Sequence, residues 1–88
     1  VHKTLMIVTK EMETVKNIIL NDINRGATIL PAVGAYKGES REIIYTILTR
    51  REMMILRHRI REIDPEAFIN VIDSREILGK GFKALDEE

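Results

Sequence analysis

The stretch 27-ATILPAVGAYKGESREIIYTIL-48 decides the fold of this chain of 88 residues. Residues 27–36 and 42–48 are rich in β-branched and other strand-forming side chains and predict two strands. Gly34, near the end of the first of these ranges, and Gly38, between the two, favour turn conformations, so we expect a hairpin. A proline cannot donate a hydrogen bond to a neighbouring strand, and Pro31 therefore predicts that the first strand of the hairpin lies at an edge of its sheet.

The segments around this hairpin predict two helices and two further strands. Apolar residues that recur every three or four positions indicate the first helix, and Gly26 predicts its left-handed end. Thr49 and Glu52 form a capping box before the second helix, which we expect to end before Pro65. The expected elements are strands over 4–8 and 67–72, helices over 11–24 and 50–63, and a short helical turn over 75–78 that Asp73 and Glu76 would open with a second capping box.

The resulting order is β-α-β-β-α-β in a single domain that covers residues 1–88. Because crossover connections are right-handed, few assemblies of this order are possible. The sequence therefore predicts an α+β protein, a ferredoxin-like two-layer sandwich with antiparallel sheet order 4-1-3-2. In that order the second strand is an edge strand, which agrees with the position of Pro31.

Three of the predicted strands carry apolar side chains on both faces. A sheet that is covered by helices on one side only should alternate between apolar and polar residues. Here each strand has apolar residues at both alternating sets of positions. In the first strand, Leu5 and Ile7 lie on one face and Met6 and Val8 on the other. In the third, Ile44 and Leu48 oppose Ile43, Tyr45 and Ile47, and in the fourth, Ile69 and Val71 oppose Phe68 and Ile72. A contiguous apolar surface favours an interface, so we expect a homo-oligomer. Scattered surface aliphatic residues, which are normal on any protein, are the alternative.

The composition excludes several classes of function. With 14 basic and 14 acidic residues the net charge is zero, so no long-range field draws the chain to nucleic acid or to an anionic membrane, and any binding must be local. The chain has no cysteine, and His2 and His58 show no metal-ligand spacing. No apolar run is long enough to span a bilayer. We therefore expect a soluble domain with no metal site and no cofactor.

Nucleic-acid binding and catalysis are also disfavoured. RNA-recognition motifs share this order of elements, but they stack bases on aromatic residues of their first and third strands. Here the first strand has no aromatic residue and the third has only Tyr45. No serine lies in a nucleophile motif, and no histidine has a carboxylate partner by spacing. We expect no nucleic-acid partner, no catalytic residues and no enzymatic activity.

Two segments remain as candidates for binding a small anionic ligand. The candidate contacts are Gly34, Tyr36, Lys37 and Gly38 in the loop, and Arg50 and Arg51 at the start of the second helix. The helix macrodipole disfavours cations in a first turn, so a bound anion would stabilise these arginines. A plain turn and a solvated helix face, with Glu39, Glu42 or Glu52 nearby, are the alternatives. Asp22, near the end of the first helix, is expected to reach solvent or to pair with Arg25.

Several short motifs together resemble the C-terminal soluble domain of the YitT family of bacterial membrane proteins, a domain of unknown function. The motifs are Arg25-Gly26 with Thr28, Gly34-Ala35-Tyr36 with Gly38, Arg50-Arg51-Glu52, Ile63-Asp64-Pro65 with Ala67-Phe68, and Gly79 with Gly81-Phe82. The resemblance covers nearly the whole chain. It implies a ferredoxin-like fold similar to the PII and ACT regulatory domains, which bind small ligands between subunits. Fold similarity by itself transfers no function.

The resemblance also implies a cellular setting. The chain begins with Val1 and not with methionine, so we expect it to be part of a longer protein whose membrane-spanning segments precede it. The domain would then lie on the cytoplasmic side of the membrane. Our leading hypothesis is a regulatory or sensor module of a multispanning bacterial membrane protein. A structural oligomerisation domain without a ligand is the alternative, and a small acylphosphatase-like enzyme is the weakest of the three hypotheses.

Overall fold

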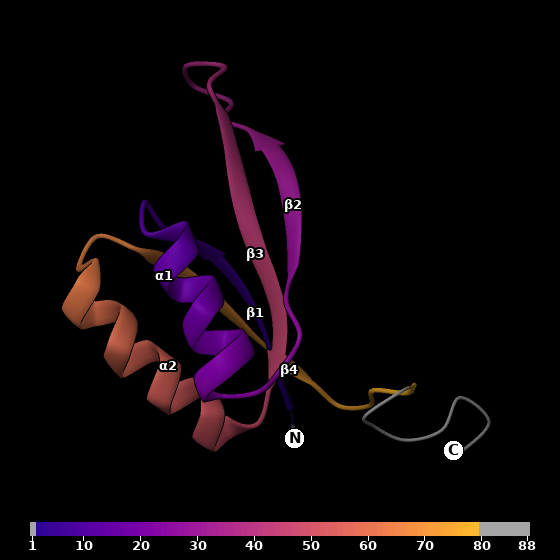
Figure 1. Ribbon diagram of the computed structural model, residues 1–88. Helices are drawn as coiled ribbons and strands as arrows, with labels where there is room; N and C mark the ends of the chain where they lie inside the picture. Colours follow the sequence, from indigo (N-terminus) through magenta and orange to yellow (C-terminus); the bar gives the residue numbers. More distant parts are fainter. Residues whose placement is uncertain (1, 80–88) are drawn as a thin grey trace.

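The computed structural model describes residues 2–79, which form an antiparallel sheet with both helices on one face (Figure 1). The elements are β1 (His2–Val8), α1 (Met12–Asn17), η1 (Ile18–Asp22), β2 (Thr28–Val33), β3 (Ser40–Leu48), α2 (Arg50–Ile63) and β4 (Phe68–Ser74). The sheet order is β2-β3-β1-β4, which confirms the ferredoxin-like fold. Pro31 lies in β2, opposite Glu42 of β3, and β2 is an edge strand as the proline requires.

The core lies between the sheet and the helix layer. Leu5 and Ile7 of β1 are fully buried, and they lie beside Thr46 and Ile44 of β3. The helices cover these strands with the apolar stripes that the spacing of three and four residues indicated. The buried hydrophobic residues are Leu5, Ile7, Val15, Ile18, Ile19, Ile44, Leu48, Leu56 and Ile60.

A buried carboxylate joins the end of α2 to the loop that follows β1. The Thr9 hydroxyl donates to Asp64 Oδ2 at 2.7 Å, and the backbone N–H of Lys10 donates to the same oxygen at 3.2 Å. The backbone N–H of Glu66 donates to Asp64 Oδ1 at 3.2 Å. The hydrogen bond from Thr9, opposed by burial and aided by the backbone donors, lowers the pKa of Asp64. Asp64 therefore fixes the end of α2 to the loop between β1 and α1.

The first helix differs from the expected continuous helix over 11–24. It begins at Met12 and changes to π-helical geometry in η1, where the backbone N–H of Ile23 donates to Ile18 O at 2.9 Å. Its left-handed end residue is Asn24, with φ of 63°, and not Gly26 as predicted. Asparagine tolerates this conformation better than other side chains do, so it ends the helix two residues earlier.

The hairpin strands also differ in length from the prediction. The strand expected over 27–36 ends at Val33, because a tight turn follows at once. In this turn the N–H of Gly34 donates to Glu39 O at 2.8 Å, and the N–H of Gly38 donates to Gly34 O at 2.8 Å. The next strand begins at Ser40 instead of residue 42, since Ser40 pairs with Val33.

The predicted helical turn over 75–78 is wrong. Strand β4 begins at Phe68 and continues to Ser74, so Asp73 pairs with β1 and does not cap a helix. Its carboxylate accepts a hydrogen bond from Lys3 Nζ at 2.5 Å, an interaction across the sheet that local spacing could not reveal. Gly81 and Phe82 of the family motif lie outside the described residues.

The capping box of α2 provides a first prediction. The Thr49 hydroxyl accepts from the Glu52 N–H at 3.1 Å, and the Thr49 N–H donates to Glu52 Oε1 at 2.8 Å. Replacing Thr49→Ala should lower the free energy of unfolding by about 1 kcal/mol, measured by urea denaturation, because an amide in the first turn loses its acceptor. Thr49→Ser keeps the hydroxyl and should stay near wild-type stability. Equal losses in both variants would contradict the capping role.

Asp64 provides a second prediction, on the pH dependence of stability. A carboxylate whose pKa is lowered by folding stabilises the protein above its ordinary pKa of 3.8, and this contribution is lost as the pH falls through the folded value. We expect Asp64→Asn to be less stable at neutral pH and to lose less stability on acidification, measured by thermal unfolding across the acid range. Glu66→Gln, an exposed neighbour, is the control. Parallel pH profiles for wild type and Asp64→Asn would contradict the role of this network.

Candidate functional site

The loop residues of the predicted ligand site lie at the tip of the β2–β3 hairpin, which projects beyond the helix layer (Figure 1). Gly38 has a positive φ of 68°, so the turn itself accounts for glycine at this position. The Tyr36 side chain is 95% exposed, and Lys37 is exposed as well. Within residues 2–79 no carboxylate forms an ion pair with Lys37. The tip thus presents an aromatic ring and a cation to solvent.

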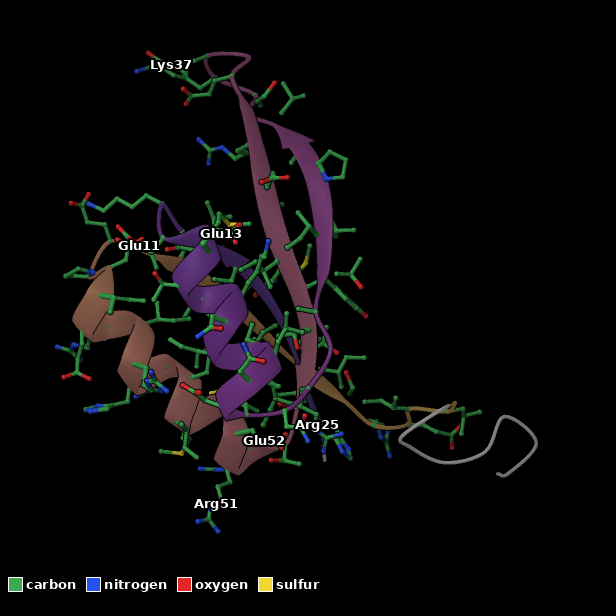
Figure 2. The ribbon with its side chains drawn as sticks, in the orientation of Figure 1. Glu11, Glu13, Arg25, Lys37, Arg51 and Glu52 are labelled. Atoms are coloured by element: carbon green, nitrogen blue, oxygen red, sulfur yellow. The ribbon has the colours of Figure 1, made fainter. Side chains whose placement is uncertain are left out.

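The arginines of the predicted site lie at the other end of the molecule. Arg51 points away from the start of α2, whereas Lys37 lies at the hairpin tip (Figure 2). A single chain therefore does not bring the two groups of candidate residues together. A ligand that contacts both groups would have to lie between two copies of the chain.

Of the carboxylates expected near the first turn of α2, Glu52 lies there. Glu52 pairs with Arg25, whose Nε lies 3.1 Å from Glu52 Oε1 (Figure 2). Burial alone would raise the pKa of Glu52, but the hydrogen bond from the Thr49 amide and the interaction with Arg25 outweigh it, and the pKa is lowered. The carboxylate of Glu52 is therefore already engaged by the cap and by Arg25, and leaves Arg50 and Arg51 without it.

The tertiary structure decides between the alternatives for two carboxylates. Glu39 lies in the hairpin and pairs with Arg41 at 3.2 Å, so it is not the neighbour that could neutralise the arginines of α2. The Asp22 side chain is 46% exposed to solvent, which was one of its two expected outcomes, and its ion-pair partner at 2.5 Å is Arg59 of α2 where Arg25 was the alternative. The pair of Asp22 and Arg59 forms because the tertiary structure places residues 37 positions apart beside each other.

The face of the sheet away from the helices is apolar, and we call it the open face. It is defined by side chains that alternate with the core residues: Met6, Val8, Leu30, Ile43, Tyr45, Ile47, Phe68 and Ile72. Met6 lies opposite Tyr45, and Val8 lies opposite Phe68. Phe68 is 65% exposed and Ile72 is 47% exposed. Within the described residues no helix covers this face (Figure 1).

Sequence reasoning missed a cleft between the hairpin and the start of α1. Its volume is about 820 Å³, and its wall includes Lys10, Pro31, Val33, Arg41 and Glu42. The cleft forms because the first residues of β3 pair with β2 only, so the hairpin extends past β1. The exposed polar run at 40–42, before the buried part of the strand, is the signal that could have indicated this overhang. Its charges are mixed, which favours no particular ligand class.

Two further features are absent from the described residues. Between residues 2 and 79, no group of three or more His, Cys, Asp or Glu side chains is arranged to hold a metal ion. In the same range no helix has the length and apolar character needed to cross a membrane.

Membrane proteins are among the curated relatives of this chain. It is 40% identical to an uncharacterised protein of Bacillus sp. (strain PS3) over 92% of this chain and 54% of that protein. It is 38% identical to the UPF0750 membrane proteins YvjA and YitT of Bacillus subtilis, over 92% and 86% of this chain. The chain spans about half the length of the first relative and 29% and 27% of the other two.

Solved structures share the fold. A DUF2179 protein from Eubacterium ventriosum superposes with a TM-score of 0.72 at 29% identity, over 82% of this chain and 99% of that one. The divalent cation tolerance protein of Thermus thermophilus gives a TM-score of 0.59 at 16% identity, over 89% and 88% of the two chains. A PII-like protein of the same organism gives 0.52 at 18% identity, over 81% and 84%. The last two show the fold alone.

The family model for uncharacterised proteins conserved in bacteria, DUF2179, matches residues 25–79. This range covers the hairpin, α2 and β4, which carry the motifs identified in the sequence. Since the match extends over more than half of the chain, the protein belongs to the DUF2179 family, whose domain is found in YitT-type membrane proteins.

Proposed function

We propose that this chain is a non-enzymatic regulatory module of a bacterial membrane protein, and that it assembles with copies of itself through the open face. The membrane-spanning segments of the parent chain would hold it on the cytoplasmic side of the membrane. Relatives that are membrane proteins support this setting. The fold that it shares with a PII-like protein supports the regulatory role by analogy.

The open face is the observation that carries the proposal. Its apolar side chains come from all four strands and neighbour one another across the sheet, with the polar Thr4, Thr28 and Asn70 among them. Contiguous exposed apolar surfaces on soluble domains usually mark sites of association. A small domain also gains from burial of a second face, because its own core is thin. A second copy of the chain offers the same apolar surface, so an interface between open faces is self-complementary.

The second part of the proposal is that the assembled protein binds a small anionic ligand. The hairpin tip supplies Tyr36 and Lys37, and the start of α2 supplies Arg50 and Arg51. These groups are separate in one chain, so the ligand would lie between the tip of one copy and α2 of a neighbour. Lysine and arginine side chains offer hydrogen-bond donors and positive charge, which suit a small phosphate or carboxylate compound. Binding at such a site would couple ligand concentration to assembly.

A structural oligomerisation domain without a ligand is the alternative function. It would use the same open face and would leave the hairpin tip unoccupied. The expectation that no histidine has a carboxylate partner is wrong, because His58 Nε2 lies 3.6 Å from Glu62 Oε1, four residues further along α2. Both side chains are exposed to solvent, so catalysis is not part of the proposal. Ligand binding therefore distinguishes the two functions.

Assembly gives the third prediction. We expect sedimentation equilibrium to show masses above the 10.2 kDa monomer at high micromolar concentration. The change Phe68→Asp with Ile72→Asp should give a monomer, because burying two carboxylates in an apolar interface costs several kcal/mol. Val33→Asp, an exposed aliphatic position in the hairpin and outside the open face, is the control and should assemble normally. A wild-type chain that stays monomeric at millimolar concentration would contradict the proposed interface.

Ligand binding gives the fourth prediction. In a thermal-shift screen of nucleotides, cyclic dinucleotides and amino acids, a ligand at 100 times its Kd should stabilise the fold by about 2.7 kcal/mol. Arg50→Ala should abolish the shift, whereas Arg59→Ala, on the same helix but paired with Asp22, should retain it. A stable oligomer without any shift would support the structural alternative and contradict the sensor role.

A further inference from the structure

The outer side of α2 carries a second exposed surface, which we call the basic face. It consists of Arg51, Met54, Ile55, Arg57, His58 and Arg61. Its two aliphatic side chains are exposed to solvent, Met54 to 50% and Ile55 to 45%. They lie on the side of α2 opposite the buried residues Leu56 and Ile60. The helix is thus apolar on two sides, and only one of them is covered by the sheet.

The basic face has a local excess of positive charge although the chain as a whole is neutral. Helix α2 holds five arginines and only two glutamates. Glu52 is engaged by Arg25 and lies off the basic face, whereas Glu62 is exposed on the same side of the helix, with Oε1 3.6 Å from His58 Nε2. In the part of the chain that the structure describes, no carboxylate forms an ion pair with Arg51, Arg57 or Arg61. These arginines are available to an external anion.

The shape of this surface suits a broad partner better than a small molecule. A shallow hollow of about 750 Å³ runs along the helix, and its lining residues are Arg50, Arg51, Met54, Ile55, His58 and Arg59. Because all of them belong to one helix, no second element closes over the hollow. On a single chain, with no hairpin tip of a neighbouring copy over Arg50 and Arg51, a small ligand would remain largely in water there, whereas an extended surface could contact aliphatic and guanidinium groups at once.

We propose that the basic face lies against the surface of an anionic lipid bilayer. Met54 and Ile55 would enter the boundary between headgroups and acyl chains, and the neighbouring arginines would contact lipid phosphates. Aliphatic residues among unpaired arginines match both the apolar and the anionic part of such a surface. A nucleic acid would use only the charge, and this face has no aromatic side chain on which bases could stack.

The inference rests on the proposed function for one point, namely that the parent protein holds this domain beside a membrane. The basic face is on the helix layer and the open face is on the other side of the sheet, so one copy could use both surfaces (Figure 1). Bilayer contact would restrict how the helix layer is oriented, and would thereby restrict which directions the hairpin tip can face.

Flotation with lipid vesicles tests the inference on the chain as given. We expect binding at low salt to vesicles of equal parts phosphatidylcholine and phosphatidylglycerol, and none to pure phosphatidylcholine. The double change Arg57→Gln with Arg61→Gln should weaken binding about 30-fold, since each basic residue near an anionic surface contributes about 1 kcal/mol. The control Lys10→Gln with Arg41→Gln removes the same charge from the loop between β1 and α1 and from β3, and should bind within about twofold of wild type.

A second variant tests the aliphatic part of the face. Met54→Ser with Ile55→Ser keeps every charge, and it should also weaken vesicle binding because both side chains are exposed and add nothing to the core. Circular dichroism should show that all variants are folded. No flotation of wild type, equal binding to neutral vesicles, or equal loss in the Lys10 and Arg41 control would overturn the inference. Undiminished binding of the serine variant, together with equal retention on heparin beads, would assign the face to a polyanion and overturn it too.

The oligomeric mass of each sample separates this inference from the proposed function. Lost flotation with retained assembly contradicts only the bilayer contact. Lost assembly with retained flotation contradicts only the interface through the open face.

Discussion

A single sheet with both of its helices on one side can bury only one of its two faces, and the rest of this structure depends on that constraint. Leu5, Ile7 and Ile44 fill the covered face, and the helices take their positions from those side chains. The other face is also apolar, so the isolated fold leaves hydrophobic surface in water. The hydrophobic effect therefore favours covering this face.

The net charge of the chain is zero, but the charged side chains are distributed unevenly over its surface. Carboxylates from elsewhere in the fold engage some of the cations: Glu52 holds Arg25, and Asp22 holds Arg59. Among residues 2–79 no carboxylate forms an ion pair with the remaining arginines of α2, and α2 becomes a local cationic surface on a neutral protein. Screening confines this field to about 10 Å, so it acts on what touches the helix and not on distant molecules.

The hairpin tip and the start of α2 lie at opposite ends of the domain. Three different surfaces point in different directions: the apolar open face, the cationic outer side of α2 and the projecting hairpin (Figures 1 and 2). Under the function proposed above, the domain would act by changing which neighbours it contacts, since a ligand can shift the equilibrium between assembled states.

The sequence by itself determined the order of the elements, the edge position of β2 through Pro31, and the start of α2 through Thr49 and Glu52, since each depends on residues within a few positions of one another. Only the tertiary structure decided which partners the charged groups take. Asp73 was expected to cap a helical turn, but β1 brings Lys3 to it across 70 positions of sequence. The site likewise could not be assembled from sequence, because the distance between two loops is set by how the sheet and helices pack, and local spacing carries no information about it.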